Sequence, residues 1–119
     1  MSNVEDSSFK SQVVYDDFAK LDIRVGRVVE VQPFPKARNP SYKIAVDLGE
    51  LGIKWSSAQI TSYAIEDLIG IQVVCVVNFP PRNIAGFQSQ VLILGVENAK
   101  GDIILLSPRS EVPKGNAIY

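Results

Sequence analysis

The side chains best suited to chemistry in this sequence are cations grouped in one stretch. Between Glu30 and Asp47 there are three cations, Lys36, Arg38 and Lys43, and no acid. The whole chain has a formal net charge of −1, but such local asymmetry lets an acidic protein hold phosphate. The alternative is a solvated basic face. We interpret this stretch as a candidate surface for RNA.

A further candidate is Arg82, which is the only charged residue in residues 68–96. It lies in residues 78–89, a link between two apolar runs that contains Pro80-Pro81 and Gly86. Proline restricts the backbone and glycine permits conformations closed to other residues, so we expect a loop of defined shape. A lone cation there is costly to bury, so Arg82 faces either water or a ligand.

Residues suited to catalysis are scarce. The sequence has no histidine, which removes the commonest general base and metal ligand, and also Ser-His and Cys-His pairs. The carboxylates are scattered, and Cys75 lies in an apolar run typical of a buried thiol. A catalytic pair of Lys54 with Ser56 or Ser57 remains, but serines that end a strand are more often hydrogen-bonding turn residues. We expect no enzymatic activity, no cofactor and no bound metal.

Length and composition indicate one globular domain. The chain has 119 residues, of which 46% are hydrophobic and 21% are charged. We expect residues 1–14 to form an arm, whose Phe9, Val13 and Val14 could dock on a partner, and residues 15–119 to form the domain with its C-terminal extension. The first residues contain no apolar signal core and no segment reaches transmembrane length. We therefore expect a cytoplasmic protein without membrane insertion.

The apolar patterns predict an all-β protein. Five main strands, a short helix between the third and fourth, and an extra C-terminal strand fit the OB-fold, a five-stranded Greek-key barrel. In that fold the loops between strands 1 and 2 and between strands 4 and 5 bind oligonucleotides. Here they are residues 33–41 and 79–89, the two cationic, proline-containing loops. The strands are expected at residues 23–31, 42–48, 53–60, 71–77 and 91–94, with the extra strand at 102–106.

Several local features refine this expectation. Gly26 is a site where the first strand can bend or bulge, so that the strand belongs to both halves of the barrel. Alternation places Tyr42, Ile44, Val46 and Leu48 in the core, and Lys43 and Asp47 on the outside. The short helix is expected to be capped by Ser62, to bury Ile65, Leu68 and Ile69, and to end at Gly70. A helical turn is expected at residues 15–21, capped by Asp16 or Asp17.

Two aromatic residues could stack on nucleic-acid bases. Phe87 and Trp55 are the candidates, and the alternative for both is core packing. Strand parity with Ile53 favours core packing for Trp55. In addition, residues 71–77 are apolar on both parities, although a small barrel has only one inside. This pattern predicts a homodimer in which a partner covers the second face.

Seven stretches of the sequence carry a resemblance to a known family: residues 17–18, 21–26, 43–49, 53–61, 76–82, 84–89 and 113–115. In their order and spacing they resemble the tRNA-binding domain family, and within it the CsaA-type branch. The resemblance covers about residues 15–119. It implies an OB-fold, a homodimer, binding of tRNA or other RNA, no enzymatic activity and a chaperone-like role linked to protein export.

The resemblance also implies which residues contact nucleic acid. Strong tRNA binders of the family resemble KPRKxRG in the second loop, whereas residues 79–86 here read FPPRNIAG. The cations that flank Arg82 are replaced by an apolar rim, which favours contact with extended apolar peptide. The implied peptide-binding residues are Phe79, Pro80, Pro81, Ile84 and Phe87. The implied nucleic-acid-binding residues are Arg24, Lys36, Arg38, Lys43, Ser56, Ser57, Asn78, Arg82 and Ser89.

Two functions follow as hypotheses. The first is a dimeric OB-fold protein that binds tRNA or other RNA and acts as an export-related chaperone for unfolded or export-bound polypeptides. The alternative is a dedicated tRNA-binding cofactor, or a structural RNA-binding module, without chaperone activity.

Overall fold

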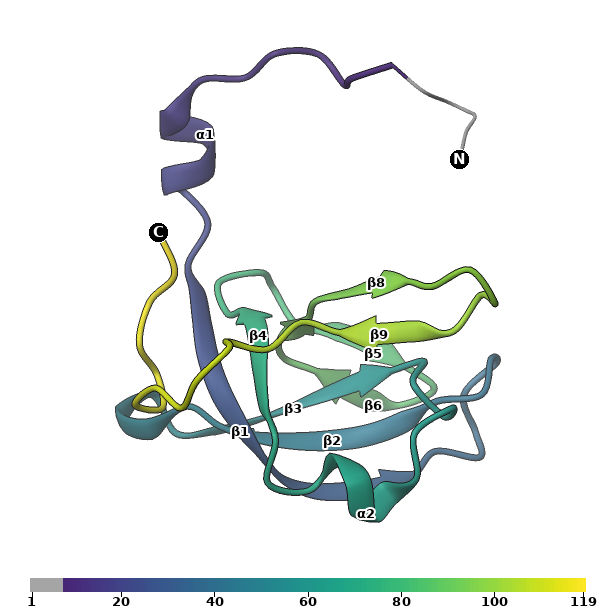
Figure 1. The fold of residues 1–119 in the computed structure, drawn as a ribbon. Helices are drawn as coiled ribbons and strands as arrows, with labels where there is room; N and C mark the ends of the chain where they lie inside the picture. Colours follow the sequence, from purple (N-terminus) through teal and green to yellow (C-terminus); the bar gives the residue numbers. More distant parts are fainter. Residues whose placement is uncertain (1–7) are drawn as a thin grey trace.

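One long strand, β1, organises the fold in the computed structural model, which describes residues 8–119. The sheet has the order β3-β2-β1-β4-β7, and all its neighbouring strands are antiparallel. The first half of β1 pairs with β4 and the second half pairs with β2, so the sheet curls around β1 (Figure 1). The strands are β1 (Ile23–Pro33), β2 (Tyr42–Asp47), β3 (Ile53–Ala58), β4 (Gln72–Val76) and β7 (Leu92–Ile93).

The expected sharing of the first strand is confirmed, but its irregularity lies elsewhere. The register between β1 and β2 shifts between Val28 and Glu30, so Val29 is the extra residue rather than Gly26. Gly26 instead allows the side chains of Val46 and Leu48 to pack closely against the backbone of β1. A Cβ at Gly26 would lie 2.3 Å from Val46 Cγ1, a distance that real Cβ atoms do not reach. Sequence alone could not separate these two uses of a glycine in a strand.

The barrel closes between β3 and residues 89–90. Gln90 N–H donates to Trp55 O at 2.7 Å, and Trp55 N–H donates to Gln90 Oε1 at 2.9 Å. Ser57 N–H donates to Ser89 Oγ at 3.1 Å. These bonds satisfy the outer edge of β3, and the result is a nearly closed barrel of the OB-fold type, as the sequence predicts.

The core fills the inside of this barrel. Ile44 and Val46 of β2 are buried as expected, and Cys75 of β4 is buried beside them, so the pKa of its thiol is raised to about 12 by desolvation. A second cluster, Ile23, Val74 and Val76, packs on the outer side of β4. The apolar residues on both parities of residues 71–77 therefore do occupy two faces. The main core contains Val28, Val31, Ile44, Val46, Leu48, Ile60, Leu68, Val73, Cys75, Val91 and Ile93.

The expected short helix between the third and fourth strands is α2 (Ile65–Leu68), and its position is confirmed. Leu68 is fully buried, and Gly70 takes a φ of +94° as the chain turns away. Two details were wrong. Ala64, not Ser62, precedes the helix and makes no side-chain cap, and Ile69 is 49% exposed.

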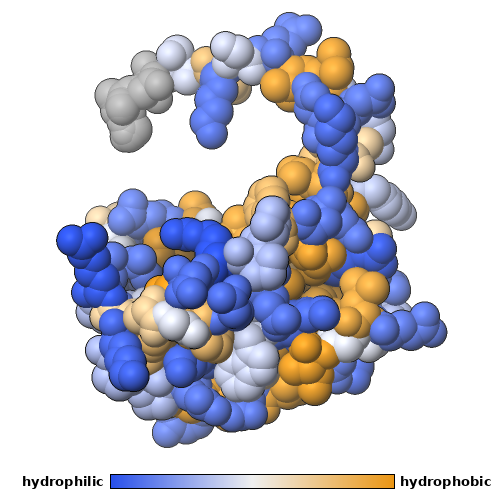
Figure 2. Space-filling model, turned by 180° about the vertical axis from the view of Figure 1, so that it is seen from behind, coloured by the Kyte–Doolittle hydropathy of each residue, from blue (hydrophilic) through white to orange (hydrophobic). Residues whose placement is uncertain are grey.

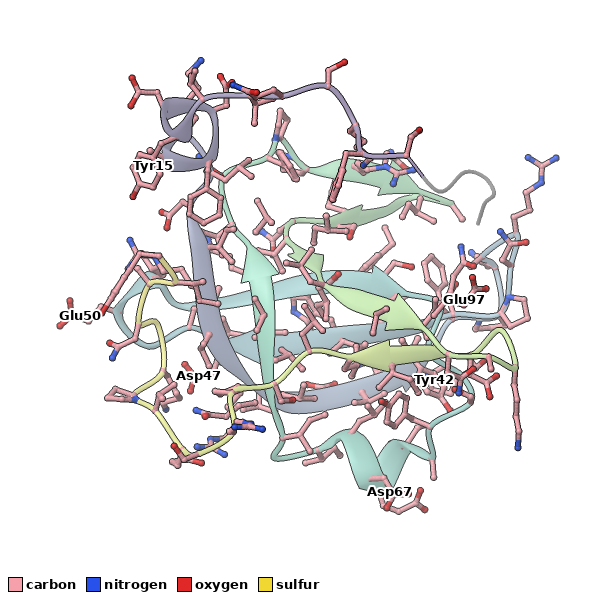
Figure 3. All side chains as sticks on the ribbon, turned by 45° about the horizontal axis from the view of Figure 1, so that its top comes forward. Tyr15, Tyr42, Asp47, Glu50, Asp67 and Glu97 are labelled. Carbon is pink, nitrogen blue, oxygen red and sulfur yellow. The ribbon has the colours of Figure 1, made fainter. Side chains whose placement is uncertain are left out.

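The N-terminal helix α1 (Tyr15–Ala19) stands off the barrel, and Figure 3 shows Tyr15 on it. Val14 N–H donates to Asp17 Oδ2 at 3.3 Å, so Asp17 supports the start of the helix although Val14 is the N-cap. Residues 8–14 form neither helix nor strand and are exposed, and the rest of the expected arm, residues 1–7, lies outside the described residues. Figure 2 shows open space between this segment and the barrel.

Two hairpins and a C-terminal segment complete the fold. The stretch expected as a loop contains hairpin β5–β6, and a second hairpin, β8–β9, includes the expected strand after residue 101. Strand β8 was not predicted. The remaining elements are β5 (Arg82–Ile84), β6 (Phe87–Ser89), β8 (Gly95–Glu97), β9 (Ile103–Leu105) and η1 (Gly49–Leu51).

The C-terminal segment pairs with the first half of β1 on the edge opposite β4. Gly115 N–H donates to Val25 O at 2.7 Å and Ile118 N–H donates to Ile23 O at 2.8 Å. Lys114 Nζ lies 2.8 Å from Asp47 Oδ2, and Figure 3 shows Asp47 beside this segment. Among the helices described, none is long and apolar enough to cross a membrane.

Candidate nucleic-acid interface

The outer faces of β2 and β3 carry the first part of the candidate site. Because Ile44 and Val46 point into the core, Lys43 on β2 points outward. Lys43 pairs with Ser57 and Ala45 pairs with Trp55, so Ser57 and Trp55 share this outer face.

This placement corrects the parity argument for Trp55. Ile53 is 55% exposed, and Trp55 lies on the same outward parity, packed on the barrel wall against Phe87. Parity with Ile53 misleads because Ile53 itself faces outward. In fact the buried positions of β3 are set by its register with β2, where Ser56 pairs with Ile44.

Three aromatic rings and one cation form a contiguous group, which we name the Lys43 cluster: Phe34, Lys43, Trp55 and Phe87. The Phe34 and Phe87 ring centroids are 5.4 Å apart, and those of Trp55 and Phe87 are 6.2 Å apart, both edge to face. Lys43 Nζ lies 4.9 Å from the Phe34 centroid and 5.0 Å from the Phe87 centroid. Both distances are within the range of cation–π attraction, so the rings hold the ammonium group in place.

A recess opens beside the Lys43 cluster, and we call it the loop recess. One wall comes from Phe34, Pro35 and Lys36 of the first loop, and the other from the β5–β6 hairpin. Its volume is about 410 Å³. The structure thus brings the two predicted binding loops together, as an OB-fold requires. The full lining is Phe34, Pro35, Lys36, Lys43, Ala85, Gly86 and Phe87.

The β5–β6 hairpin owes its shape to its turn. Ala85 has a φ of +50° and Gly86 a φ of +87°, as in the tight turns that match the twist of antiparallel strands. Gly86 N–H donates to Asn83 Oδ1 at 2.9 Å, which fixes the turn further. Arg82 pairs with Ser89 at the open end of the hairpin and is exposed.

A second, smaller recess lies at this open end. It has a volume of about 210 Å³ and brings together Ser57, Arg82 and Ser89 of the predicted nucleic-acid face. Phe79, Pro80 and Ile84 of the predicted peptide rim also line it. Polar and apolar candidates therefore share one surface.

The four cations of this surface form no ion pair with another described residue, a property that Lys10, Lys54, Lys100 and Arg109 share elsewhere in the chain. The ion pairs within residues 8–119 join Lys20 to Asp17, Arg24 to Asp22, Arg27 to Glu111 and Lys114 to Asp47. None of these pairs within the described chain includes Lys36, Arg38, Lys43 or Arg82. Those four are thus available to an anion, whereas the paired cations would have to break a contact first.

Three of the predicted nucleic-acid residues are engaged in the fold instead. Ser56 is 1% exposed and faces the core, which contradicts a direct binding role. Arg24 is paired with Asp22 and donates to Gly115 O at 3.0 Å, and this pairing raises the pKa of its guanidinium. Asn78 accepts from Asp22 N–H at 2.9 Å and donates to Lys20 O at 2.8 Å. These contacts join distant segments, which sequence spacing cannot reveal.

The predicted apolar rim is divided rather than continuous. Phe87 packs into the Lys43 cluster, so it does not join an exposed patch. Phe79 is 45% exposed, and together with Pro81 it lines a cavity of about 390 Å³ at the end of the barrel. Lys54 and Gln90 also line that cavity. The sequence suggests Lys54 only as a catalytic partner of Ser56 or Ser57, and it suggests no site for Gln90.

Chemistry other than binding finds little support in the described residues. Lys54 makes no hydrogen bond to Ser56 or Ser57, and Ser56 is buried. Within residues 8–119 no group of His, Cys, Asp and Glu side chains is arranged to hold a metal ion. The site is therefore an unpaired cationic surface with an aromatic floor, which suits phosphate and base contacts.

The comparison with known proteins agrees with this description. The family described as "Putative tRNA binding domain" matches residues 23–117. The chain belongs to this family. Within it, the chain is similar to chaperone CsaA from Bacillus anthracis str. Ames, with 49% identity and a TM-score of 0.87 over 92% of this chain and 100% of that one.

Two further relatives differ in how much of their own length this chain covers. The CsaA chaperone protein from Picrophilus torridus is 44% identical, with a TM-score of 0.87 over 91% of this chain and 100% of that one. Methionine–tRNA ligase of Porphyromonas gingivalis is 38% identical over 106 residues, which is 89% of this chain and 15% of the ligase. The chain thus spans about 15% of the length of the curated relatives it matches.

Proposed function

We propose that this protein is a non-enzymatic, dimeric OB-fold protein that binds tRNA or related RNA and also holds unfolded or export-bound polypeptides. The observation that carries the RNA part is the surface of Lys36, Arg38, Lys43 and Arg82, which have no acidic partner in the described chain. Ser57 and Ser89 lie on the same surface. The proposal puts the protein in the cytoplasm, where tRNA is found.

The strength of RNA binding follows from the number of cations. Four phosphate contacts give a slope of log affinity against log salt of about −3 for a single strand. Such binding is modest and falls quickly with salt. A dimer presents the surface twice, so a large RNA that reaches both copies gains avidity.

The RNA proposal is tested by titrating fluorescent tRNA with the protein across a series of salt concentrations. The variant that replaces Lys36, Arg38, Lys43 and Arg82 with Ala is expected to lose salt-dependent binding. A matched control replaces Lys10, Lys20, Lys100 and Arg109, which are also exposed, and should bind as the parent does. Unchanged affinity in the first variant would refute this surface.

The dimer is supported by an uncovered apolar surface on the outer side of β1 and β4, which we call the apolar groove. It has a volume of about 610 Å³, and no charged side chain lines it. The arm of the same chain carries exposed Phe9, Val13 and Val14, and Figure 2 shows apolar side chains on that arm and on the barrel beside it. We assign the groove to the arm of a second copy, because docking of that arm would bury the apolar residues of the arm and those of the groove. Its lining is Ile23, Val25, Val74, Leu94, Leu106, Ser107, Pro108, Val112, Asn116, Ala117 and Ile118.

The chaperone part is supported by Phe79, Pro80 and Pro81, which are exposed beside two recesses, and by the similarity to CsaA chaperones. Exposed apolar groups of this kind can contact extended apolar peptide. The test is suppression of aggregation of a denatured client protein. If RNA binding is present and suppression is absent, the alternative function of a dedicated tRNA-binding module holds.

A further inference from the structure

Of the two recesses on the cationic surface, the loop recess is the larger, and it is lined by two cations where the other is lined by Arg82 alone. Its volume of about 410 Å³ lies near the lower end of small-molecule sites, about 300–1,000 Å³. That volume suits one nucleotide better than a strand that continues in both directions. Arg38 and Arg82 do not line this recess, so they remain for phosphates along the strand.

The charge of the recess matches a dianion. Lys36 and Lys43 are its two charged lining residues, and no carboxylate lines it. A phosphate monoester carries a charge of about −1.5 to −2 at pH 7, whereas each diester along a strand carries only one negative charge. Two ammonium groups that face one recess therefore complement a terminal phosphate better than an internal one.

We propose that the loop recess binds the terminal phosphate monoester of an RNA strand, with Lys36 and Lys43 as its ligands. This inference rests on the proposed RNA-binding function and adds the feature of the RNA that is recognised. A 5′-phosphate and a 3′-phosphate are both monoesters at a strand end, so either group has the chemistry that this site would bind.

The aromatic residues give Lys43 a fixed position in this site. Its Nζ is held 4.9 Å and 5.0 Å from two ring centroids, so little side-chain entropy is lost when phosphate binds. Phe87 thus acts as a positioning residue. Pro35, Ala85 and Phe87 supply an apolar wall that contacts the terminal sugar and base without hydrogen bonds, so recognition of the end is independent of sequence.

The inference is tested with one short single-stranded RNA made with a 5′-phosphate, with a 3′-phosphate, or with hydroxyls at both ends. Anisotropy titrations at fixed salt are expected to give about tenfold tighter binding for one phosphorylated form than for the hydroxyl form. The preference is expected to shrink as pH falls below the second phosphate pKa, which is about 6, because the phosphate monoester loses charge there.

Variants separate this site from general RNA binding. Lys36→Ala should abolish the preference for the phosphorylated end, whereas Lys100→Ala, an exposed lysine in the β8–β9 turn, should keep it. Phe87→Leu should reduce the preference and Phe87→Tyr should restore it, with circular dichroism to check that both variants fold. A preference that persists in Lys36→Ala refutes the inference.

The outcomes also separate the inference from the proposed function. Equal, salt-dependent affinity for all three RNAs refutes the end site and leaves RNA binding in place. If none of the RNAs binds and tRNA does not bind either, both proposals fail. Tighter binding of the 5′-phosphate or of the 3′-phosphate supports the site and identifies the end it takes.

Discussion

The outer faces of β2 and β4 belong to one sheet, yet they present opposite chemistry. On β2 the outward-facing Lys43 lies among aromatic rings, whereas on β4 the outward-facing Val74 and Val76 form an apolar cluster. The inner faces of both strands are alike, since each supplies core residues. The inside of a small barrel is therefore constrained by packing, and the outside is free to differ.

The two regions meet at β1, which pairs with both strands. A change in β1 should affect both regions, while changes on either outer face should affect only one. The following predictions test this division, beginning with the largest expected effect.

Gly26→Ala should disturb both regions. The added Cβ would lie 2.3 Å from Val46 Cγ1 and 2.8 Å from Leu48 Cδ2, and both side chains are fully buried. Overpacking of this kind costs about 1–3 kcal/mol of unfolding free energy, measured by urea denaturation. Gly52→Ala is a comparison of another kind: no atom lies within 4 Å of the new Cβ, but a φ of +86° with a ψ of −173° is essentially restricted to glycine, so backbone strain alone costs about 1–3 kcal/mol there. A loss well below 1 kcal/mol in Gly26→Ala would contradict the close approach.

Leu106→Glu should affect the apolar groove alone. Leu106 lines the groove and is 40% exposed in the single chain, so in the proposed dimer a carboxylate there would be buried by the partner. The dimer dissociation constant is expected to rise about a hundredfold, measured by analytical ultracentrifugation. Ile53→Glu, on β3 and away from the groove, should leave the mass unchanged. A monomer mass for the parent protein would remove the basis of this prediction.

Phe79→Ser should weaken peptide holding and spare RNA binding. The side chain is 45% exposed beside the barrel end, so its loss removes apolar contact area without opening the core. Several-fold more protein should be needed to suppress aggregation of a denatured client, while the affinity for tRNA should stay the same. Ile53→Ser removes a similarly exposed apolar group elsewhere, and equal loss in both variants would argue against a specific site.

Asp47→Asn should have the smallest effect and should act through the C-terminal segment. The pKa of Asp47 is lowered by the hydrogen bond from Lys114 and by the N–H of Gly49, so its stabilising contribution exists above its unfolded pKa of about 3.9 and disappears as pH falls through the folded value. The parent should have a slightly higher Tm than the variant at pH 7. The difference should vanish in acid, and a constant difference at all pH values would contradict this origin.

The features that could be predicted from the sequence are those that depend on local patterns. The order of strands, the helix between the third and fourth, and the buried face of β2 follow from apolar periodicity, which is a local property. The two binding loops follow from their prolines and cations, and the structure brings both to one recess. The second apolar face of β4 could be predicted because residues 71–77 are apolar at both odd and even positions.

Other features depended on contacts between distant segments. The register between β2 and β3 put Ser56 inside and Trp55 outside, and a shift of one residue would have reversed them. The pairing of Arg24 with Gly115 and of Asn78 with Lys20 required the docked C-terminal segment and the start of β1.

The amino-acid sequence specifies which side chains are available for function: four cations, a few aromatic side chains and an excess of apolar residues in one strand. Which of these side chains act together depends on the folded chain. The tertiary structure left Lys36, Arg38, Lys43 and Arg82 without acidic partners in the described chain, and it turned Phe87 from an expected rim residue into a support for Lys43. The physical reason is that charge and hydrophobicity belong to single residues, whereas pairing and burial depend on the distance between residues far apart in the chain.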